Sequence, residues 1–378
     1  NNSGRFPRGL SAMVQSLTTW LYDGDPLAPL AWEAPLNALK ARIVAGEPVF
    51  EQAIKDWFLN NEHRATVVLL PDTKLGKARE DAEKARVDAV QAAAGAEARA
   101  RMVEETTRLM EAQSAPDSPE ALATIPALGI EDLPRENALL PRAVAELPET
   151  FLTHELPTQG IAYATLLLPL ANVPDRLVPL LPLFARSLTE TGTAKRDFTE
   201  LGALMAAKTG GLGAETLVGL VRGSRKTFGY LGVSGKAVYD KLPDLFALTR
   251  EILLEPLTDA DVLRERLGQM LLEGKARLEH GLQSAGHAAV SARLRARFNG
   301  ASAIAERTSG LSYLESVRGL LERMDTDPQS VLNDLEELRS RIIARPGAVM
   351  DCTAEAQGLA LVETEARQLL RALSPARA

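Results

Sequence analysis

The four histidines are the residues of this sequence best suited to chemistry, because imidazole binds metals and transfers protons. They are His63, His154, His280 and His287, and none belongs to an H-E-x-x-H or H-x-x-E-H zinc motif. On a straight helix, His280 and His287 would stand about 10.5 Å apart along the axis. One zinc ion needs each ligating nitrogen within about 2 Å, so the pair could share it only across a break at Gly281 or Gly286. We expect solvated or capping histidines and keep this pair as an alternative metal site.

Two glycine-rich stretches invite a phosphate-binding interpretation. KTGGLGAET, residues 208–216, follows a predicted helix and leads into a strand, which reverses the strand–loop–helix order of phosphate loops. It is better interpreted as a helix C-cap in which Gly210 or Gly211 takes the left-handed conformation. GVSGKA, residues 232–237, resembles the end of a Walker loop but has Ala237 where Ser or Thr should bind magnesium. Neither stretch predicts a nucleotide site.

The cysteine and the serines of the sequence do not indicate nucleophilic catalysis either. Cys352 is the only cysteine, which excludes an internal disulfide and a Cys-based zinc site, and no histidine is near it in sequence. The sequence contains no G-x-S-x-G motif. Acidic pairs such as Glu336-Glu337 fall on charged helices and need no catalytic explanation. The residues by themselves therefore predict no active site.

The composition indicates a soluble globular protein of two or three domains. Of the 378 residues, 46% are hydrophobic and 25% are charged, the usual mixture for such proteins. The net charge of −7 argues against a nucleic-acid partner, which would require a basic excess. No apolar run approaches the roughly 20 residues that cross a bilayer, so we expect no membrane partner. One free cysteine and the absence of a targeting signal fit a bacterial cytoplasm or an organelle matrix equally. The opening residues, NNSGRFPRG, read as the middle of a longer protein.

The first 148 residues combine short helices, a strand, a charged segment and a connector. Helical periodicity between residues 9 and 60 predicts three helices, and the β-branched run at 63–70 predicts a strand. Residues 74–113 are rich in Ala, Glu, Arg and Lys, with Gly95 near the centre, and predict two solvated helices folded into a hairpin. The prolines between residues 116 and 148 predict an extended connector lying against a neighbour.

The remaining residues predict an α+β domain. Strands at 150–157 and 160–170 look paired with each other around Thr158-Gln159-Gly160, and strands at 213–221 and 227–234 look paired around Gly223-Ser224. A last strand is expected near 347–354. Helices are predicted within 177–193 and at about 198–208, 237–254, 259–280, 284–297, 311–324, 328–344 and 355–373. Hairpin-like strands with grouped helices indicate an antiparallel sheet with packed helices, not a doubly wound parallel sheet.

Six stretches follow one another in a recognisable order. They are FPRGLSAMVQSLTTWLYDGDPLAPLAWEAPLNALKARI, NNEHRATVVLLPD, SPEALATIPALGIEDLPREN, THELPTQGIAYATLLLPL, LPLFARSLTETGT and KTGGL. In this order they resemble the presequence-protease branch of the pitrilysin (insulinase) family of zinc metallopeptidases. The resemblance covers nearly the whole chain and is strongest at 6–72 and 116–235.

Members of that family are built from four related α+β domains, and only the first carries the H-x-x-E-H zinc helix. Two halves, joined by a helical hairpin, close around short unfolded peptides. The resemblance implies that residues 1–72 are the C-terminal part of the second domain, residues 73–118 the charged hairpin linker, and residues 119–378 the proline-rich connector plus the third domain. It implies no cofactor in this chain, zinc in the absent first domain, and the other parent domains and short unfolded peptides as partners.

The resemblance also assigns a degenerate zinc helix. The family's first domain has a sequence of the type P-H-x-x-E-H, and the corresponding helix here reads P-L-F-A-R-S at residues 182–187. Leu183, Arg186 and Ser187 stand where His, Glu and His would be. Leucine cannot ligate zinc, serine is a poor ligand, and arginine is a permanent cation that repels the metal.

The leading hypothesis is therefore a non-catalytic central segment of a zinc metalloendopeptidase, acting as hinge and half of the closed peptide chamber. The chain alone is expected to be inactive, because it lacks the H-x-x-E-H motif. The alternative is a stand-alone helical interaction or scaffold protein that uses the charged hairpin as its binding arm. The two differ at residues 9–72, since a split domain would expose an orphan apolar face there, whereas a self-sufficient protein would bury it.

Overall fold

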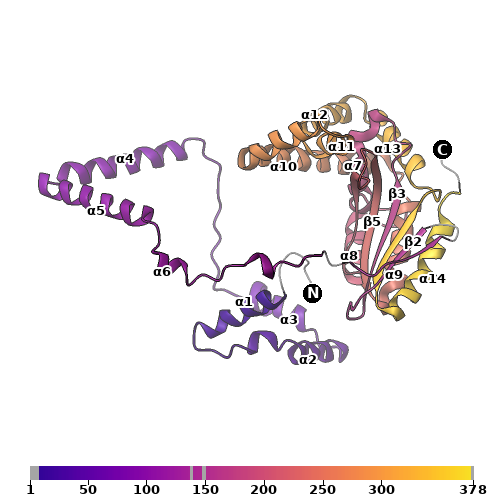
Figure 1. Ribbon diagram of the computed structural model, residues 1–378, viewed down its shortest axis with the longest axis horizontal. Coiled ribbons are helices and arrows are strands. Elements are labelled where there is room, and N and C mark those ends of the chain that lie inside the picture. The colour runs from indigo at the N-terminus through magenta and orange to yellow at the C-terminus, as the bar shows by residue number, and fades with distance from the viewer. Residues whose placement is uncertain (1–7, 137–138, 147–149, 376–378) are drawn as a thin grey trace. The chain divides into compact units, whose positions relative to one another are not determined.

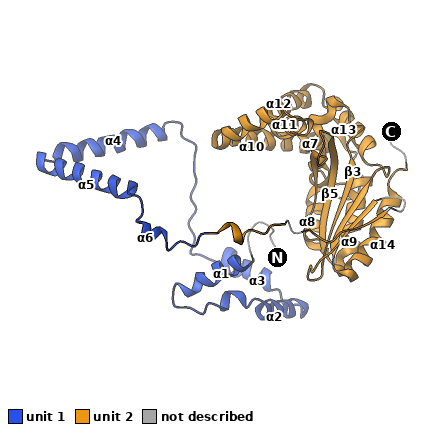
Figure 2. Cartoon of the chain, in the orientation of Figure 1, with its two compact units in different colours: residues 1–127 blue, residues 128–378 orange. Residues whose placement is uncertain are grey.

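The computed structural model describes residues 8–136, 139–146 and 150–375. The chain divides into two compact units, residues 1–127 and residues 128–378 (Figure 2). Residues 1–7 of the predicted split domain and Pro148 of the predicted connector lie outside the described residues.

The first unit begins with three helices that bury little. They are α1 (Arg8–Trp20), α2 (Glu33–Val44) and α3 (Val49–Ile54), the last continued by a π-helical turn at Lys55–Leu59. No residue between 9 and 72 is buried. Trp20, Trp32 and Trp57 are 62%, 62% and 73% exposed. The apolar face expected in this segment is therefore present and uncovered.

The strand predicted at 63–70 is not formed, and residues 61–72 have no regular secondary structure. Val67, Val68, Leu69 and Leu70 are each more than 70% exposed. A β-branched run becomes a strand only when a neighbouring strand accepts and donates its backbone hydrogen bonds. No described strand pairs with this segment.

The charged segment forms the two predicted helices, α4 (Leu75–Ala93) and α5 (Ala96–Ser114), joined into a hairpin at Gly95 (Figure 1). Neither helix has a buried residue, and α4 carries exposed ion pairs from Lys77 to Asp81 and from Arg86 to Glu83. Exposed pairs at this spacing stabilise a helix only slightly, because water screens their charges. The solvated surface predicted from the charge pattern is confirmed.

The connector is only partly as predicted. It contains the short helix α6 (Pro119–Leu122), a 3₁₀ turn at Ile130–Asp132 and a strand, β1 (Ala143–Glu146), which the proline density concealed. Leu128, Ile130 and Leu139 are more than 80% exposed. The connector is therefore exposed at these residues, and its last strand, β1, pairs with β2 of the sheet.

Among the described residues, six strands form one mixed sheet in the order β1-β2-β6-β3-β5-β4. The five strands after β1 are β2 (Thr150–Glu155), β3 (Ile161–Pro169), β4 (Leu212–Leu220), β5 (Thr227–Val238) and β6 (Val349–Ala354). The predicted β4–β5 hairpin is confirmed, and every other pairing is antiparallel except β2 with β6. The predicted pairing of 150–157 with 160–170 is wrong, because β6 lies between β2 and β3.

One face of the sheet is covered and the other is open. Along β3, the side chains Ala162, Ala164, Leu166 and Leu168 are buried and alternate with more exposed neighbours such as Tyr163. This period of two is the pattern of a half-buried strand. The helices α7 (Leu181–Glu190), α9 (Leu242–Leu254) and α14 (Ala356–Ala372) pack against the sheet and close the core. The α+β class predicted from sequence is thereby confirmed.

The remaining helices are α8 (Phe198–Lys208), α10 (Ala260–Arg295), α11 (Gly300–Ser309), α12 (Leu311–Thr326) and α13 (Pro328–Ile342), and 3₁₀ turns lie at Ala28–Leu30, Asp175–Leu180 and Tyr239–Lys241. Of these helices, α10 to α13 lie together near α7, and α8 lies near α9 (Figure 1). The helices predicted at 259–280 and 284–297 together make up α10, and the break predicted between them is present as a kink at Ala285, where φ is −137° and ψ is 38°. The helix predicted from residue 237 starts at Leu242, because Ala237 and Val238 end β5.

Candidate functional site

Helix α7, which carries Leu183, Arg186 and Ser187, is a core helix. It follows the 3₁₀ turn Asp175–Leu180 and has Pro182 in its first turn, where proline costs no helical hydrogen bond. It packs against β4 on one side and against α10 and α13 on others. Leu183 is 3% exposed, so its side chain belongs to the hydrophobic core of the second unit.

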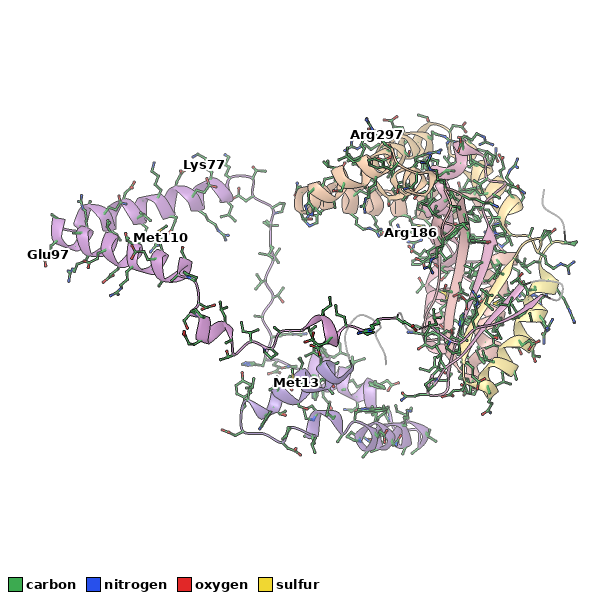
Figure 3. All side chains as sticks on the ribbon, in the orientation of Figure 1. Met13, Lys77, Glu97, Met110, Arg186 and Arg297 are labelled. Carbon is green, nitrogen blue, oxygen red and sulfur yellow. The ribbon has the colours of Figure 1, made fainter. Side chains whose placement is uncertain are left out.

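Arg186 links α7 to α10. Its guanidinium donates hydrogen bonds to the Glu190 carboxylate at 3.1 and 2.5 Å and to Glu273 at 3.1 Å. A further bond, of 3.1 Å, goes to the backbone carbonyl of Met270. The hydrogen bond from Arg186 lowers the pKa of Glu273, as expected for a carboxylate beside a fixed cation. Arg186, labelled in Figure 3, thus forms ion pairs with carboxylates of both helices.

Ser187 uses its hydroxyl within its own helix. The Oγ atom donates to the carbonyl oxygen of Phe184 at 2.8 Å. The three positions are thus occupied by a buried apolar side chain, a paired cation and a helix-bonded hydroxyl. Leucine and arginine offer no lone pair to a divalent metal, and a serine hydroxyl is a poor ligand.

His280 and His287 are both exposed and lie on α10, on either side of its kink at Ala285. Across the described ranges, no three His, Cys, Asp or Glu side chains lie close enough together to hold a metal ion. The other two histidines are also separate. His63 is exposed on the irregular segment, while His154 on β2 places Nδ1 2.8 Å from the Pro141 carbonyl and Nε2 3.4 Å from Asp351.

A hollow that the sequence does not predict opens beside Arg186. It has a volume of about 240 Å³ and lies where α7, α10 and α12 meet. Leu183, Leu271 and Val317 contribute apolar walls, and Arg277 and Tyr313 contribute polar groups. The sequence does contain a signal for this hollow, the stretch GKARLEHG, in which Gly274 and Gly281 flank Arg277. Glycines have no side chain, so two of them on one helix face leave space beside the arginine.

The chain matches a known protein family. A family model described as peptidase M16, subgroup C, associated matches residues 69–320. The chain belongs to this peptidase-associated family. The match begins just before the hairpin and covers the sheet domain as far as α12.

Within the M16 family, the chain belongs to the presequence-protease branch, as its curated relatives indicate. It is 36% identical over 374 residues, 98% of the chain, to presequence protease 1, chloroplastic/mitochondrial, of Arabidopsis thaliana, and covers 34% of that protein. It is 28% identical to the protein HypA of Clostridium perfringens over 90% of the chain and 34% of that protein. It is 22% identical to the mitochondrial presequence protease of Danio rerio over 94% of the chain and 35% of that protein.

The chain therefore spans about a third of the length of the curated relatives it matches. Among solved structures, a peptidase M16 inactive domain from Pseudomonas fluorescens is similar at 20% identity and a TM-score of 0.44, covering 63% of this chain and 52% of that one. No helix among the described residues is long and apolar enough to cross a membrane.

The other reactive-looking features of this peptidase-associated chain are structural. Cys352 is buried on β6, and burial raises the pKa of its thiol to about 12, so it remains protonated and a poor nucleophile. Helix α8 has Thr209 as its C-cap, which is in an extended conformation, and the positive φ predicted for Gly210 or Gly211 is found at Gly211, at +131°, in the turn that leads into β4 and not at the helix end. GVSGKA lies inside β5, so this stretch is not a phosphate loop.

Proposed function

We propose that this chain is the non-catalytic central segment of a zinc metalloendopeptidase that degrades short unfolded peptides. Within that parent it acts as hinge and as half of a closed peptide chamber. Residues 1–72 complete the second domain, residues 73–118 form the hairpin linker, and residues 119–378 supply the connector and third domain. The family match and the names of the presequence proteases support this proposal.

The observation that carries the proposal is the environment of α7. Leu183, Arg186 and Ser187 occupy the positions of a zinc helix, but the first is buried at 3% exposure and the second is ion-paired to Glu190 and Glu273. A zinc site needs lone-pair donors around an open centre, whereas these side chains pack and pair within the domain. Catalysis and zinc binding then fall to the first domain of the parent.

The partners follow from the surfaces left uncovered. The apolar face of residues 9–72 needs another part of its domain to bury it, since exposed apolar patches of this kind mark interfaces. The remaining domains of the same parent are the proposed partners, and short unfolded peptides are its substrates. Two of the relatives are named for the mitochondrion, one of them also for the chloroplast, so an organelle matrix, or the cytoplasm of a bacterium, is the proposed location.

Zinc content tests the proposal directly. After dialysis against zinc and removal of free metal, the purified chain is expected to hold no stoichiometric zinc, as measured by atomic absorption. One tightly held zinc per chain would overturn the proposal and redirect attention to His280 and His287. The double variant His280→Ala/His287→Ala would then show whether these side chains hold the ion.

Limited proteolysis tests the incomplete domain. With chymotrypsin, cleavage is expected first at Trp20, Trp57 or Leu69, because exposed apolar side chains on poorly packed backbone are accessible to protease. Mass spectrometry of the early fragments identifies the sites, and light scattering reports whether the uncovered face causes dimerisation. Equal protection of residues 9–72 and residues 150–375 would favour the stand-alone alternative.

A further inference from the structure

The hollow beside Arg186 continues into a second one along α10. The first, of about 240 Å³, is the hollow described above, and the second, of about 260 Å³, lies between α10 and the start of α12. The two share Arg277, Leu278 and Ser309, so they form one groove. Apolar cavities of about 150 Å³ already admit a benzene ring, so each half accommodates a leucine-sized side chain.

Arg277 is the charged residue at the junction of the two halves. It is exposed and has no ion pair or hydrogen bond among the residues that the structure describes. Arg186, by contrast, is already neutralised by Glu190 and Glu273. An uncommitted guanidinium beside apolar walls binds a carboxylate well, since it can offer two parallel N–H donors.

Tyr313 adds a hydroxyl to the first half of the groove. Burial raises the pKa of Tyr313, while the positive charges of Arg186 and Arg277 oppose that rise. Because Glu190 and Glu273 neutralise Arg186, the unpaired cation that acts on this hydroxyl is Arg277. A positive field with a free O–H donor favours an anion in the hollow.

The spacing of the groove suits an extended peptide. Gly274 lines the first half and Gly281 the second, and seven residues on a helix correspond to about 10.5 Å along the axis. Three residues of polyproline II, a conformation common in unfolded chains, cover about 9.3 Å and return side chains to the same face. Two apolar side chains three residues apart can therefore enter the two halves, with Arg277 between them.

We propose that this groove binds unfolded peptides through a carboxylate on Arg277 and apolar side chains in the two adjacent hollows. This inference rests on the proposed function and specifies the class of peptide, one with apolar residues three apart and an acidic group next to them. The carboxylate is supplied by a Glu or Asp side chain or by the C-terminus of the peptide.

The test uses the full chain and fluorescein-labelled peptides in an anisotropy titration. The probe is an acetylated and amidated peptide containing Leu-Glu-Ser-Leu within Gly-Ser flanks, compared with its Leu-Gln-Ser-Leu counterpart. The acidic peptide is expected to bind about tenfold more tightly, as a charge-assisted hydrogen bond provides. A Leu-Gln-Ser-Leu peptide with a free C-terminal carboxylate distinguishes the two sources of the anion.

Matched variants on the same helix separate the groove from the rest of the surface. Arg277→Ala should abolish the preference for the acidic peptide. Arg264→Ala, which removes another exposed arginine of α10 that has no ion pair within the described part of the chain, should leave it unchanged. Gly274→Leu and Gly281→Leu should weaken both peptides about tenfold by filling the hollows, and Gly268→Leu should not. A Cβ atom at each of these three glycines meets no atom within 4 Å, so a side chain can begin at each position without a clash at its first carbon.

Equal binding of the acidic and amide peptides to the wild-type chain, or an unchanged preference in Arg277→Ala, would overturn the groove assignment. Neither result bears on zinc content, so the failure of this inference is distinguishable from the failure of the proposed function.

Discussion

Replacing Leu183 by histidine is expected to destabilise the 128–378 unit by about 3 kcal/mol without creating a zinc site. Leu183 is 3% exposed and sits in the core beneath α10. The substitution loses the free energy of burying a leucine and places a polar ring where partners are scarce. Zinc still finds no second ligand on the helix, because Arg186 is ion-paired and Ser187 bonds to its own backbone.

Urea unfolding followed by two signals measures this effect in one experiment. All three tryptophans, Trp20, Trp32 and Trp57, lie in the 1–127 unit, so their fluorescence follows that unit alone. Far-UV circular dichroism follows both. The midpoint of the dichroism change should fall, while the tryptophan fluorescence should match that of the wild-type chain at every urea concentration. Leu272→His, at a 58% exposed position on α10, is the matched control and should change stability by less than about 0.5 kcal/mol. A tightly bound zinc in Leu183→His would contradict the account of α7.

Replacing Arg196 by methionine is expected to destabilise the second unit by about 2 kcal/mol at pH 7. Glu251 is 8% exposed and accepts hydrogen bonds from the Thr193 hydroxyl at 2.7 Å and from Arg196. Removing one partner of a buried pair typically costs about 3–5 kcal/mol. The expected value is lower because the Arg196 side chain is about one-third exposed and water screens it.

The same pair makes the stability of the second unit depend on pH. Burial opposes ionisation of Glu251, but the hydrogen bonds from Arg196 and Thr193 outweigh it and lower the pKa of Glu251 below its ordinary value of 4.5. A lowered folded-state pKa contributes stability above the unfolded-state pKa, and this contribution is lost as the pH falls through the folded-state pKa. In Arg196→Met the buried carboxylate loses its hydrogen-bonded cation, keeps only the nearby charge of Lys195 and protonates more readily, so the difference from wild type should shrink below about pH 5.

Urea midpoints at pH 7 and pH 4.5 measure this change. Arg318→Met, which removes an exposed pair with Glu279, is the control and should leave the midpoint nearly unchanged at either pH, because solvent screens an exposed pair. An effect of Arg196→Met that is the same at both pH values would show that packing, and not the charge pair, is responsible.

Local sequence patterns predict the local elements of this fold. The β4–β5 hairpin is encoded by two β-rich runs around Gly223-Ser224, and α14 by its apolar periodicity. Local patterns do not predict which strands pair with each other. Residues 150–157 and 160–170 look like neighbours because they are adjacent in sequence, but nothing in either run reveals that residues 349–354 pair with both.

Other errors have equally specific causes. The sequence pattern places a break in α10 near Gly281, and the structure has that break at Ala285 instead, because a pattern locates the end of a helix only to within a few residues. At the site, the resemblance supplies the positions Leu183, Arg186 and Ser187. It does not supply the burial of Leu183 or the bond from Arg186 to Glu273, a residue 87 positions away. The groove at Arg277 exists only once α10 and α12 pack together, so local patterns do not predict it.

The position of β6 determines when the protein can fold during synthesis. β3 ends at Pro169 and β6 begins at Val349, so about 180 residues are made between the two strands that must pair. At about 5–20 residues per second, the ribosome needs roughly 10–40 s for this stretch, while facing edges of β2 and β3 wait unpaired on the nascent chain. Unpaired strand edges promote aggregation, and long-range pairing is slow. The newly made chain thus depends on protection, by a chaperone or by the ribosome surface, until its last strand arrives.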